Sequence, residues 1–426
     1  MIRDFWVENY LSICDRQSIS FESKTADAFL NVEISPGLFL NKIGIFYGAN
    51  ASGKSNMLFA IQNVFDLLFY SQTDISEQVS TAPPFQLSKN KSTKMHITFY
   101  AESIRYDYDV EYVKDHIIKE NLYHYPNGSK ALFYERVFKG EGIQADIKFG
   151  DSLKIKAETQ KTLKENTLNN HSVLSTYRKV SLKEDIRPIA NLFKWIEEHV
   201  HEIDGDNVKN PVDELKEVYN DAKRKRFYDI MLKKADLNIS NFRPVTAQRN
   251  ISPKIKKMIL EDATLPEPLK EKLLEKEDED IIFTNHSPKG DFDIPRRLQS
   301  TGTMQYIKSL HFLYDLITGN HIYLLDELDE DMHYDLFLYF LNVFLFNSEK
   351  SQLIFTSQET ALLEEDLLNE HRDLVWFVEK DHETASSIYS RADSFGLHKN
   401  LSLYNSYKIG RLGAKPELGS PFIDFD

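Results

Sequence analysis

The stretch Gly44 to Asn56, GIFYGANASGKSN, decides the fold of this chain. It begins as a short apolar strand, continues through a glycine-bearing loop that ends in Gly53-Lys54-Ser55, and leads directly into an apolar run with helical spacing. The loop satisfies the pattern G-x-x-x-x-G-K-[ST] with a strand before it and a helix after it. Backbone N–H groups of such a loop and of the helix N-terminus can point at phosphate oxygens. The stretch therefore predicts a nucleotide-phosphate site in an α/β fold.

Individual residues of this loop have predicted roles. Lys54 can reach the β- and γ-phosphate oxygens, and the Ser55 hydroxyl can ligate Mg²⁺. A chance match on a glycine-rich turn is the alternative, and the flanking strand and helix disfavour it. The predicted nucleotide contacts in the loop are Gly48, Asn50, Ala51, Ser52, Gly53, Lys54, Ser55 and Asn56.

Composition excludes several classes of protein. The 426 residues allow two or three lobes, and 41% hydrophobic residues exclude a disordered chain. No run approaches the roughly 20 apolar residues that span a bilayer, and the N-terminus, MIRDFWVENYLSI, lacks the unbroken apolar core of a signal peptide. A net charge of -14 disfavours non-specific coating of nucleic acid, and the single cysteine, Cys14, allows no internal disulfide. We expect a cytoplasmic protein without a membrane segment.

Patterns along the chain suggest three segments. Residues 1–150 contain short apolar strands around the phosphate loop, followed by strands with Pro126-Asn127-Gly128 at a turn, which predict an antiparallel meander. Residues 151–280 are poor in glycine and rich in charged amphipathic runs, which predict a helical insertion from about Lys154 to Asp278. Residues 281–426 return to short apolar strands separated by helices, an α/β pattern.

A second half of the site is predicted at the end of a later strand. Hydrolysis needs a carboxylate that holds Mg²⁺ and a base beside it. The run IYLLDE supplies Asp326 for the metal and Glu327 for the water. An acidic first turn of the next helix is the alternative interpretation, because carboxylates suit a positive helix end. The long separation between Lys54 and these carboxylates indicates a nucleotide fold with a large insertion.

Four segments in combination resemble one family. They are GANASGKSN, LQSTGTMQYI at 298–307, YLLDELDEDMH at 323–333 and LIFTSQETALL at 353–363. They look like the phosphate loop, signature, metal and switch segments of ABC-type ATPases of the SMC and RecF kind. With the tail segments DLVWFVEKD and YKIGRLGAKPELG, the chain resembles the RloA/AbiLi-like AAA-family ATPases of bacterial phage-defence and abortive-infection operons. The resemblance implies an α/β fold, an ABC-type P-loop ATPase head with a mixed sheet, an antiparallel meander and a large helical insertion, and ATP with Mg²⁺ as ligands.

The resemblance also implies a dimer. Ser300, Gly302 and Thr303, with Thr301 between them, take the place of the signature that contacts the γ-phosphate bound in a second subunit. Two heads in head-to-tail arrangement would then sandwich two nucleotides. A Ser/Thr cap of the following helix explains the same residues and stays an alternative.

Further family positions follow the metal carboxylates. Leu328 and Asp329 match the short loop that reaches the dimer seam, and His333 matches a family histidine that more often packs or caps than catalyses.

Two glutamines complete the predicted site. Gln86 matches a Mg²⁺ and water contact, although an exposed turn residue is an equal alternative. Gln358 departs from the family, whose usual histidine donates a hydrogen bond toward the γ-phosphate. A glutamine amide can also donate but cannot shuttle a proton. Hydrolysis would then be slow or triggered by a partner.

An effector is not apparent in the chain. The resemblance therefore implies a separate Toprim or HNH nuclease or toxin, with a phage protein or nucleic acid as trigger. The acidic stretch near Glu275 to Asp280 is interpreted as a solvated helix end. The basic run Lys223 to Arg226, with Lys254, Lys256 and Lys257, is either a solvated helix face or a nucleic-acid contact. Two other hypotheses therefore stay open: a RecF/SMC-like ATP-gated DNA clamp in repair, and an ATP-binding scaffold with negligible turnover.

Overall fold

In the computed structural model, the chain forms two compact units. The first contains Met1–Asp204, Asp315–Asp329 and Leu341–Asp426, and the second contains Gly205–Tyr314 and Glu330–Phe340. The described residues are 1–70, 74–140, 145–182, 185–201, 203, 210–248, 252–262, 264–274, 277–398, 401–416 and 419–423.

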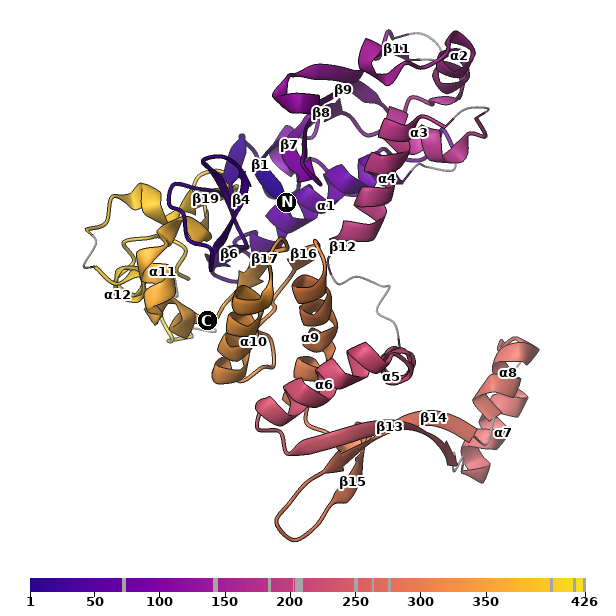
Figure 1. Ribbon diagram of the computed structural model, residues 1–426, viewed down its shortest axis with the longest axis vertical. Helices are drawn as coiled ribbons and strands as arrows, with labels where there is room; N and C mark the ends of the chain where they lie inside the picture. Colours follow the sequence, from indigo (N-terminus) through magenta and orange to yellow (C-terminus); the bar gives the residue numbers. More distant parts are fainter. Residues whose placement is uncertain are drawn as a thin grey trace. The chain divides into compact units, whose positions relative to one another are not determined.

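A six-stranded sheet of the first unit carries the phosphate loop (Figure 1). Four parallel pairs join its first five strands, and the last strand runs antiparallel to its neighbour. In spatial order the strands are β12 (Val200–His201), β16 (Ile322–Leu325), β17 (Gln352–Ser357), β6 (Ile43–Gly48), β18 (Val375–Lys380) and β19 (Ser387–Arg391). β6, β16 and β17 are buried along their whole length, as expected for parallel strands covered on both faces. Because they are parallel, their carboxyl ends meet at one edge.

An antiparallel sheet of seven strands forms the meander of the first unit. Its spatial order is β11 (Asp146–Phe149), β10 (Ala131–Val137), β9 (Ile117–His124), β8 (Ile104–Tyr112), β7 (Thr93–Ala101), β1 (Ile2–Glu8) and β2 (Gln17–Ser20). A smaller sheet, also in this unit, pairs β3 (Glu22–Ser23), β5 (Leu38–Asn41) and β4 (Asn31–Ser35). The prediction of a mixed sheet plus an antiparallel meander in an α/β fold is confirmed.

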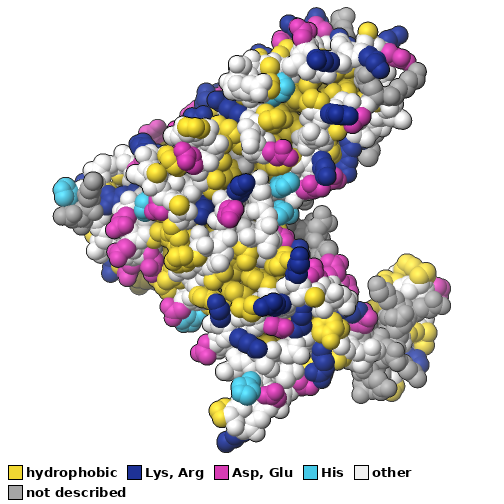
Figure 2. All heavy atoms as spheres, viewed as in Figure 1, with side chains coloured by type: hydrophobic (Ala, Val, Ile, Leu, Met, Phe, Trp, Pro, Cys, Tyr) yellow, Lys and Arg dark blue, Asp and Glu magenta, His cyan; other side chains and the backbone are white. Residues whose placement is uncertain are grey.

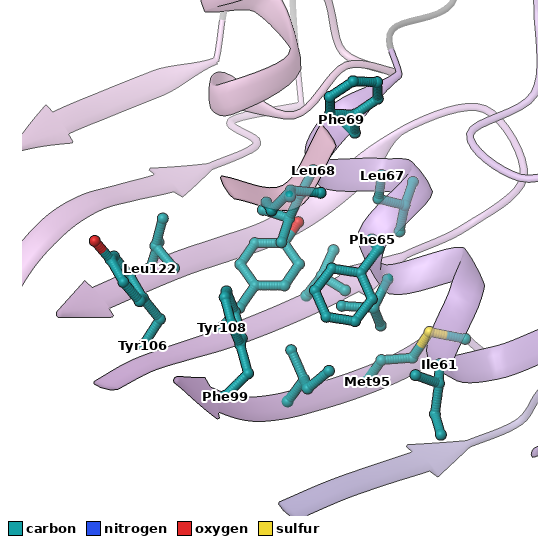
Figure 3. Close-up of a cluster of buried hydrophobic side chains, with 14 of the residues drawn as sticks. Ile61, Phe65, Leu67, Leu68, Phe69, Met95, Phe99, Tyr106, Tyr108 and Leu122 are labelled. Carbon is teal, nitrogen blue, oxygen red and sulfur yellow. The ribbon is translucent and has the colours of Figure 1, made fainter. Parts of the chain in front are cut away.

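Helix α1 (Lys54–Phe69) starts at the phosphate loop and packs against both large sheets. Its buried face contributes Ile61, Phe65 and Leu68 to the main core, where they lie near Met95 and Phe99 of β7 (Figure 3). The rings of Phe65 and Phe99 meet edge to face, with centroids 5.4 Å apart. The helix that begins at the phosphate loop is thus anchored by the core.

The remaining helices of the first unit surround these sheets. α2 (Ala157–Asn166), α3 (Val173–Lys179) and α4 (Arg187–His199) follow the meander, and α3 and α4 contact α1. Residues 151–204, which the sequence pattern assigns to the insertion, therefore belong to this unit. The C-terminal part adds α11 (Asp366–Glu370) and α12 (Leu403–Lys408).

The second unit contains part of the predicted helical insertion. Its helices are α5 (Pro211–Asn220), α6 (Ala222–Lys234), α7 (Pro253–Glu261) and α8 (Glu267–Leu274). α9 (Thr301–Thr318) and α10 (Tyr334–Asn347) run from this unit into the first. None of the helices in the described part of the chain is long and apolar enough to cross a membrane.

A long β-ribbon in the second unit differs from the predicted helical run. β13 (Ile239–Gln248), β14 (Glu277–Asn285) and β15 (Phe292–Pro295) form an antiparallel sheet. Phe242 of β13 packs against Phe283 of β14, with ring centroids 6.0 Å apart and both side chains fully buried. β14 also includes residues 277–280, so this part of the acidic stretch is strand and not a helix end, and residues 275–276 lie outside the described residues. Cross-strand packing, which local charge patterns do not reveal, decides this segment.

Candidate functional site

The phosphate loop connects β6 to α1 in a conformation that requires glycine at two positions. Gly53 has a φ of 103°, and the neighbouring Ala51 has a φ of 63°. A Cβ atom at Gly48 would overlap the Val378 carbonyl oxygen and the Ser52 hydroxyl. Gly48 is therefore needed for close packing and Gly53 for left-handed backbone. The first-turn N–H groups of α1, which have no partner inside the helix, lie directly after this loop.

Lys54 lies at the centre of the site. Its side chain is buried, with 5% exposed, and its Nζ donates to the carbonyl oxygens of Gly48 (2.9 Å) and Ala49 (3.2 Å). Burial lowers the pKa of Lys54, and the carboxylates of Glu327 and Asp326 partly oppose this effect. The amine is therefore a buried positive group that faces carboxylates, an arrangement suited to binding an anion together with a cation.

The carboxyl end of β16 places Asp326 and Glu327 at the same edge. The Thr356 hydroxyl of β17 donates to Asp326 Oδ1 (2.6 Å) and accepts from the Glu327 backbone N–H (2.8 Å). Glu327 itself has a φ of 48°. Thr356 lies in the predicted switch segment, but its sequence context assigned it no role; its place one residue before the end of an apolar strand was a possible signal. Thr356 fixes the orientation of both predicted acidic residues.

The segment after β17 is bonded to this acidic loop. Asp329 Oδ2 accepts hydrogen bonds from the Ser357 hydroxyl (2.9 Å) and from the backbone N–H groups of Gln358 (3.2 Å) and Glu359 (2.9 Å). Gln358 Nε2 donates to Glu327 Oε1 at 2.5 Å. Lys54, Asp326, Glu327, Asp329 and Gln358 are thus brought together, while their chemical roles stay predictions.

The residues at this edge fit ATP and Mg²⁺. The Ser52 hydroxyl is buried in the loop and has no hydrogen-bond partner among the described residues. Such an orphaned donor suits a phosphate oxygen. Within the described residues, no group of three or more His, Cys, Asp or Glu side chains could hold a metal ion. Mg²⁺ does not need one, because it is commonly bound by one or two protein carboxylates together with phosphates and water. The residues predicted to hold it are Ser55 and Asp326.

Other predicted residues are not joined to this edge by any described hydrogen bond. Gln86 is exposed on a short 3-10 helix (Gln86–Ser88), and its amide donates to the Pro84 carbonyl at 3.4 Å. His333 is exposed and accepts from the Asp335 backbone N–H at 3.3 Å, which is a capping contact. Leu328 is 4% exposed and packs in the interior. The described contact of Gln86 does not support its predicted metal role, whereas His333 caps a helix, which is the commoner role of the family histidine.

The predicted signature lies in the second unit, at the start of α9. The Ser300 hydroxyl accepts from the Thr303 N–H at 3.1 Å and contacts the Thr303 hydroxyl at 2.7 Å. This is the capping arrangement that was the alternative interpretation. Ser300 and Thr301 are exposed, and Gly302 and Thr303 are half-buried. The cap accounts for the helix start and leaves the predicted nucleotide contact untested.

A family model matches residues 45–364 of the chain, from the phosphate loop to beyond Gln358. Its description is "AAA domain, putative AbiEii toxin, Type IV TA system". The chain belongs to this AAA domain family. No curated protein matches the chain by sequence.

Solved structures of SMC heads are similar to this AAA domain protein, with low sequence identity and low TM-scores. The SMC head domain from Thermotoga maritima has 13% identity and a TM-score of 0.40, covering 92% of this chain and 98% of that one. An SmcHead bound to the C-winged helix domain of ScpA has 14% identity and a TM-score of 0.40, covering 96% and 99%.

Proposed function

We propose that this AAA domain protein binds ATP with Mg²⁺ and hydrolyses it in a dimer that controls a separate toxin or nuclease. The observation that carries the proposal is the convergence of Lys54, Asp326, Glu327 and Gln358 beside the phosphate loop. These residues follow the ends of three parallel strands, β6, β16 and β17, whose carboxyl ends share one edge. Ligands of open α/β sheets bind at such an edge.

The residues divide the chemical work. Lys54 and the loop N–H groups bind phosphate. Ser55 and Asp326 would hold Mg²⁺, which would supply positive charge to the phosphate oxygens. Glu327 is the base that orients and activates the attacking water. Gln358 positions the Glu327 carboxylate through its amide, and Asp329 holds the Gln358 segment in place. An amide that cannot transfer a proton favours slow basal turnover.

Completion of the site requires a second copy of the chain. In this proposal, Ser300, Gly302 and Thr303 of one chain contact the γ-phosphate bound to the other. Support comes from the resemblance to ABC-type signatures and from the exposure of the segment, where Leu298 is 69% exposed. An exposed large apolar residue beside polar hydroxyls suits a contact surface.

The biological role that we propose is RloA/AbiLi-like phage defence. Closure of the dimer on ATP would hold or release a Toprim or HNH nuclease or toxin when a phage protein or nucleic acid is detected. The family description, which names a putative AbiEii toxin and a Type IV TA system, supports a toxin partner. A toxin-like or nuclease open reading frame beside this one would add support, and a repair operon would oppose it.

A DNA clamp has less support from the charged surface. Arg224 stacks over Tyr314 at 4.8 Å, and Lys225 bonds Asp229 at 2.6 Å, so these members of the basic run have partners within the second unit. On the face drawn in Figure 2, acidic and basic side chains are interspersed. Duplex binding generally needs a continuous basic surface.

The test combines turnover with protection. The purified full-length chain should hydrolyse ATP with Mg²⁺ and lose this activity in EDTA. Cells that express the chain with its neighbouring gene should resist phage, and Lys54→Ala should abolish resistance. Full protection by Lys54→Ala would contradict an ATP-gated mechanism. Strong, salt-sensitive and ATP-dependent DNA binding by the chain alone would favour the clamp instead.

A further inference from the structure

Two hydroxyls of β19 bind the outer side of the phosphate loop. Ser387 Oγ donates to the Ser52 carbonyl oxygen at 2.5 Å, and Tyr389 OH donates to the Gly53 carbonyl oxygen at 2.5 Å. Both residues are buried, Ser387 with 1% exposed. Alternate residues of a strand point to the same face, so β19 presents this pair together. Two consecutive peptide groups of the loop are therefore held from one direction.

Ser387 is also the last hydroxyl in a chain of hydrogen bonds. Asn56 Nδ2 donates to Ser12 Oγ at 2.5 Å, and Ser12 Oγ lies 2.7 Å from Ser387 Oγ. A carbonyl oxygen only accepts, so the Ser387 hydroxyl donates its one proton to the Ser52 carbonyl oxygen. Ser12 must then donate to Ser387. The order Asn56, Ser12, Ser387, Ser52 leaves every member satisfied.

The same segments are joined through the backbone. The Ser387 N–H donates to the Ser12 carbonyl oxygen at 2.7 Å. A Cβ atom at Gly53 would overlap both the Ser387 and the Ser12 hydroxyls. Gly53 is thus required by this contact as well as by its left-handed φ. Burial raises the pKa of Tyr389, so its hydroxyl keeps the proton that it donates.

Peptide geometry links these bonds to ligand binding. In a planar trans peptide, the C=O and N–H groups point in opposite directions. When the Ser52 and Gly53 carbonyls point to β19, the N–H groups of Gly53 and Lys54 point away from it. Backbone N–H groups of this loop are those that cradle phosphate oxygens. The two hydroxyls therefore fix the direction of two candidate phosphate donors.

We propose that Ser387 and Tyr389, with Ser12 and Asn56 behind Ser387, are positioning residues that aim the Gly53 and Lys54 N–H groups at the phosphates of a nucleoside di- or triphosphate. The inference rests on the proposed function, because it assumes that this loop binds such a ligand. Neither β19 nor Ser12 lies in the motif that predicts the loop.

The experiment measures Mg²⁺-nucleotide binding by calorimetry in the full-length chain. Ser387→Ala and Tyr389→Phe each remove one hydroxyl, and Ser390→Ala is the matched control because Ser390 points to the opposite face of β19. Loss of one aiming bond should weaken Kd for ATP and for ADP about tenfold. The control should match wild type. Circular dichroism establishes that each variant is folded.

A double-mutant cycle separates positioning from general loosening of the structure. Ser12→Ala removes only the support behind Ser387, so it should weaken binding by no more than Ser387→Ala does. The double variant should be no worse than Ser387→Ala alone, because both residues belong to one chain of bonds. When Ser387→Ala and Tyr389→Phe are combined, their losses of nucleotide-binding free energy should be about additive, because the two bonds hold different peptide groups. KM for ATP should rise about tenfold with kcat within about twofold, because ground-state and transition-state binding weaken together.

The outcomes distinguish the two proposals. If wild type binds ATP and the variants bind equally well, or if kcat falls while KM is unchanged, the positioning inference is wrong. If Ser387→Ala does not fold, Ser12→Ala on the neighbouring turn decides the same question. If wild type binds neither ATP nor ADP, the proposed function fails, and this inference fails with it.

Discussion

The phosphate-loop edge and the start of α9 differ in how their polar groups are satisfied. At the edge, side chains far apart in sequence bond one another: Gln358 to Glu327, Thr356 to Asp326 and Ser387 to the loop. At the start of α9, the described bonds of Ser300 are local: its hydroxyl bonds Thr303, and its carbonyl oxygen accepts from the Met304 N–H at 3.1 Å. Ser300 and Thr301 are exposed.

The phosphate-loop edge is therefore preorganised, whereas the described bonds at the start of α9 serve only to cap that helix. Preorganised dipoles and charges cost no reorganisation when a ligand arrives. A capped helix start with exposed hydroxyls has no such network, and the role proposed for it is contact with a nucleotide bound to another chain.

Glu327→Gln should have the largest effect on turnover. The amide keeps an oxygen that can accept from Gln358 Nε2, but it removes the basic carboxylate. We expect kcat to fall about a thousandfold, within the range of general-base catalysis, with ATP Kd near the wild-type value. Glu349→Gln, an exposed carboxylate of the same unit, is the control. Retention of more than a tenth of wild-type kcat would exclude Glu327 as the base.

Lys54→Ala should weaken ATP binding about a hundredfold, because a buried charged donor is lost. Binding is measured by calorimetry, with the exposed Lys89 replaced by Ala as the control. A variant that is folded by circular dichroism and still binds ATP with wild-type affinity would show that the loop binds something else.

Gln358 distinguishes donation of a hydrogen bond from transfer of a proton. Gln358→His keeps a donor near Glu327 and should preserve or raise basal ATPase activity. Gln358→Ala removes the donor and should lower kcat about tenfold. Steady-state phosphate release measures both variants. Complete loss of activity in Gln358→His would contradict the switch position assigned to Gln358.

The smallest effect lies in the meander, away from the compared regions. Burial lowers the pKa of His124, whose Nε2 lies 2.9 Å from Ser152 Oγ. The folded state then binds fewer protons than the unfolded state below pH 6.5, so stability is present above 6.5 and is lost as pH falls through the lowered pKa. When the pH is lowered from 7.5 to 5.5, the urea midpoint of unfolding should fall more for wild type than for His124→Gln. Equal falls would contradict the prediction.

Much of the edge was predictable because one physical rule connects its parts. Lys54 follows β6 and Asp326 follows β16, and parallel strands end at a shared edge. Spacing within each motif was enough to choose these residues. Thr356 was missed because its role depends on the register between β16 and β17, where Leu325 pairs with Phe355.

Other features depend on pairings that local sequence does not specify. β19 reaches the loop because it is antiparallel to β18, which no motif indicates. β13 lies in a charged segment whose sequence pattern predicts a helix. It forms a strand instead, with Phe242 packed on Phe283 of β14. Gln86 follows a family pattern, but in the structure its amide bonds the Pro84 carbonyl.

In the proposed dimer, the nucleotide site of one chain is completed by Ser300 to Thr303 of the other chain. Lys54→Ala disables the loop, and Ser300→Arg places a bulky cation in the proposed signature, so each variant alone should be inactive. In a head-to-tail dimer, an equimolar mixture rebuilds one intact site in half of the dimers and should recover about a quarter of wild-type ATPase activity. Full activity of Ser300→Arg alone, or no recovery in mixed dimers isolated by two tags, would contradict the account.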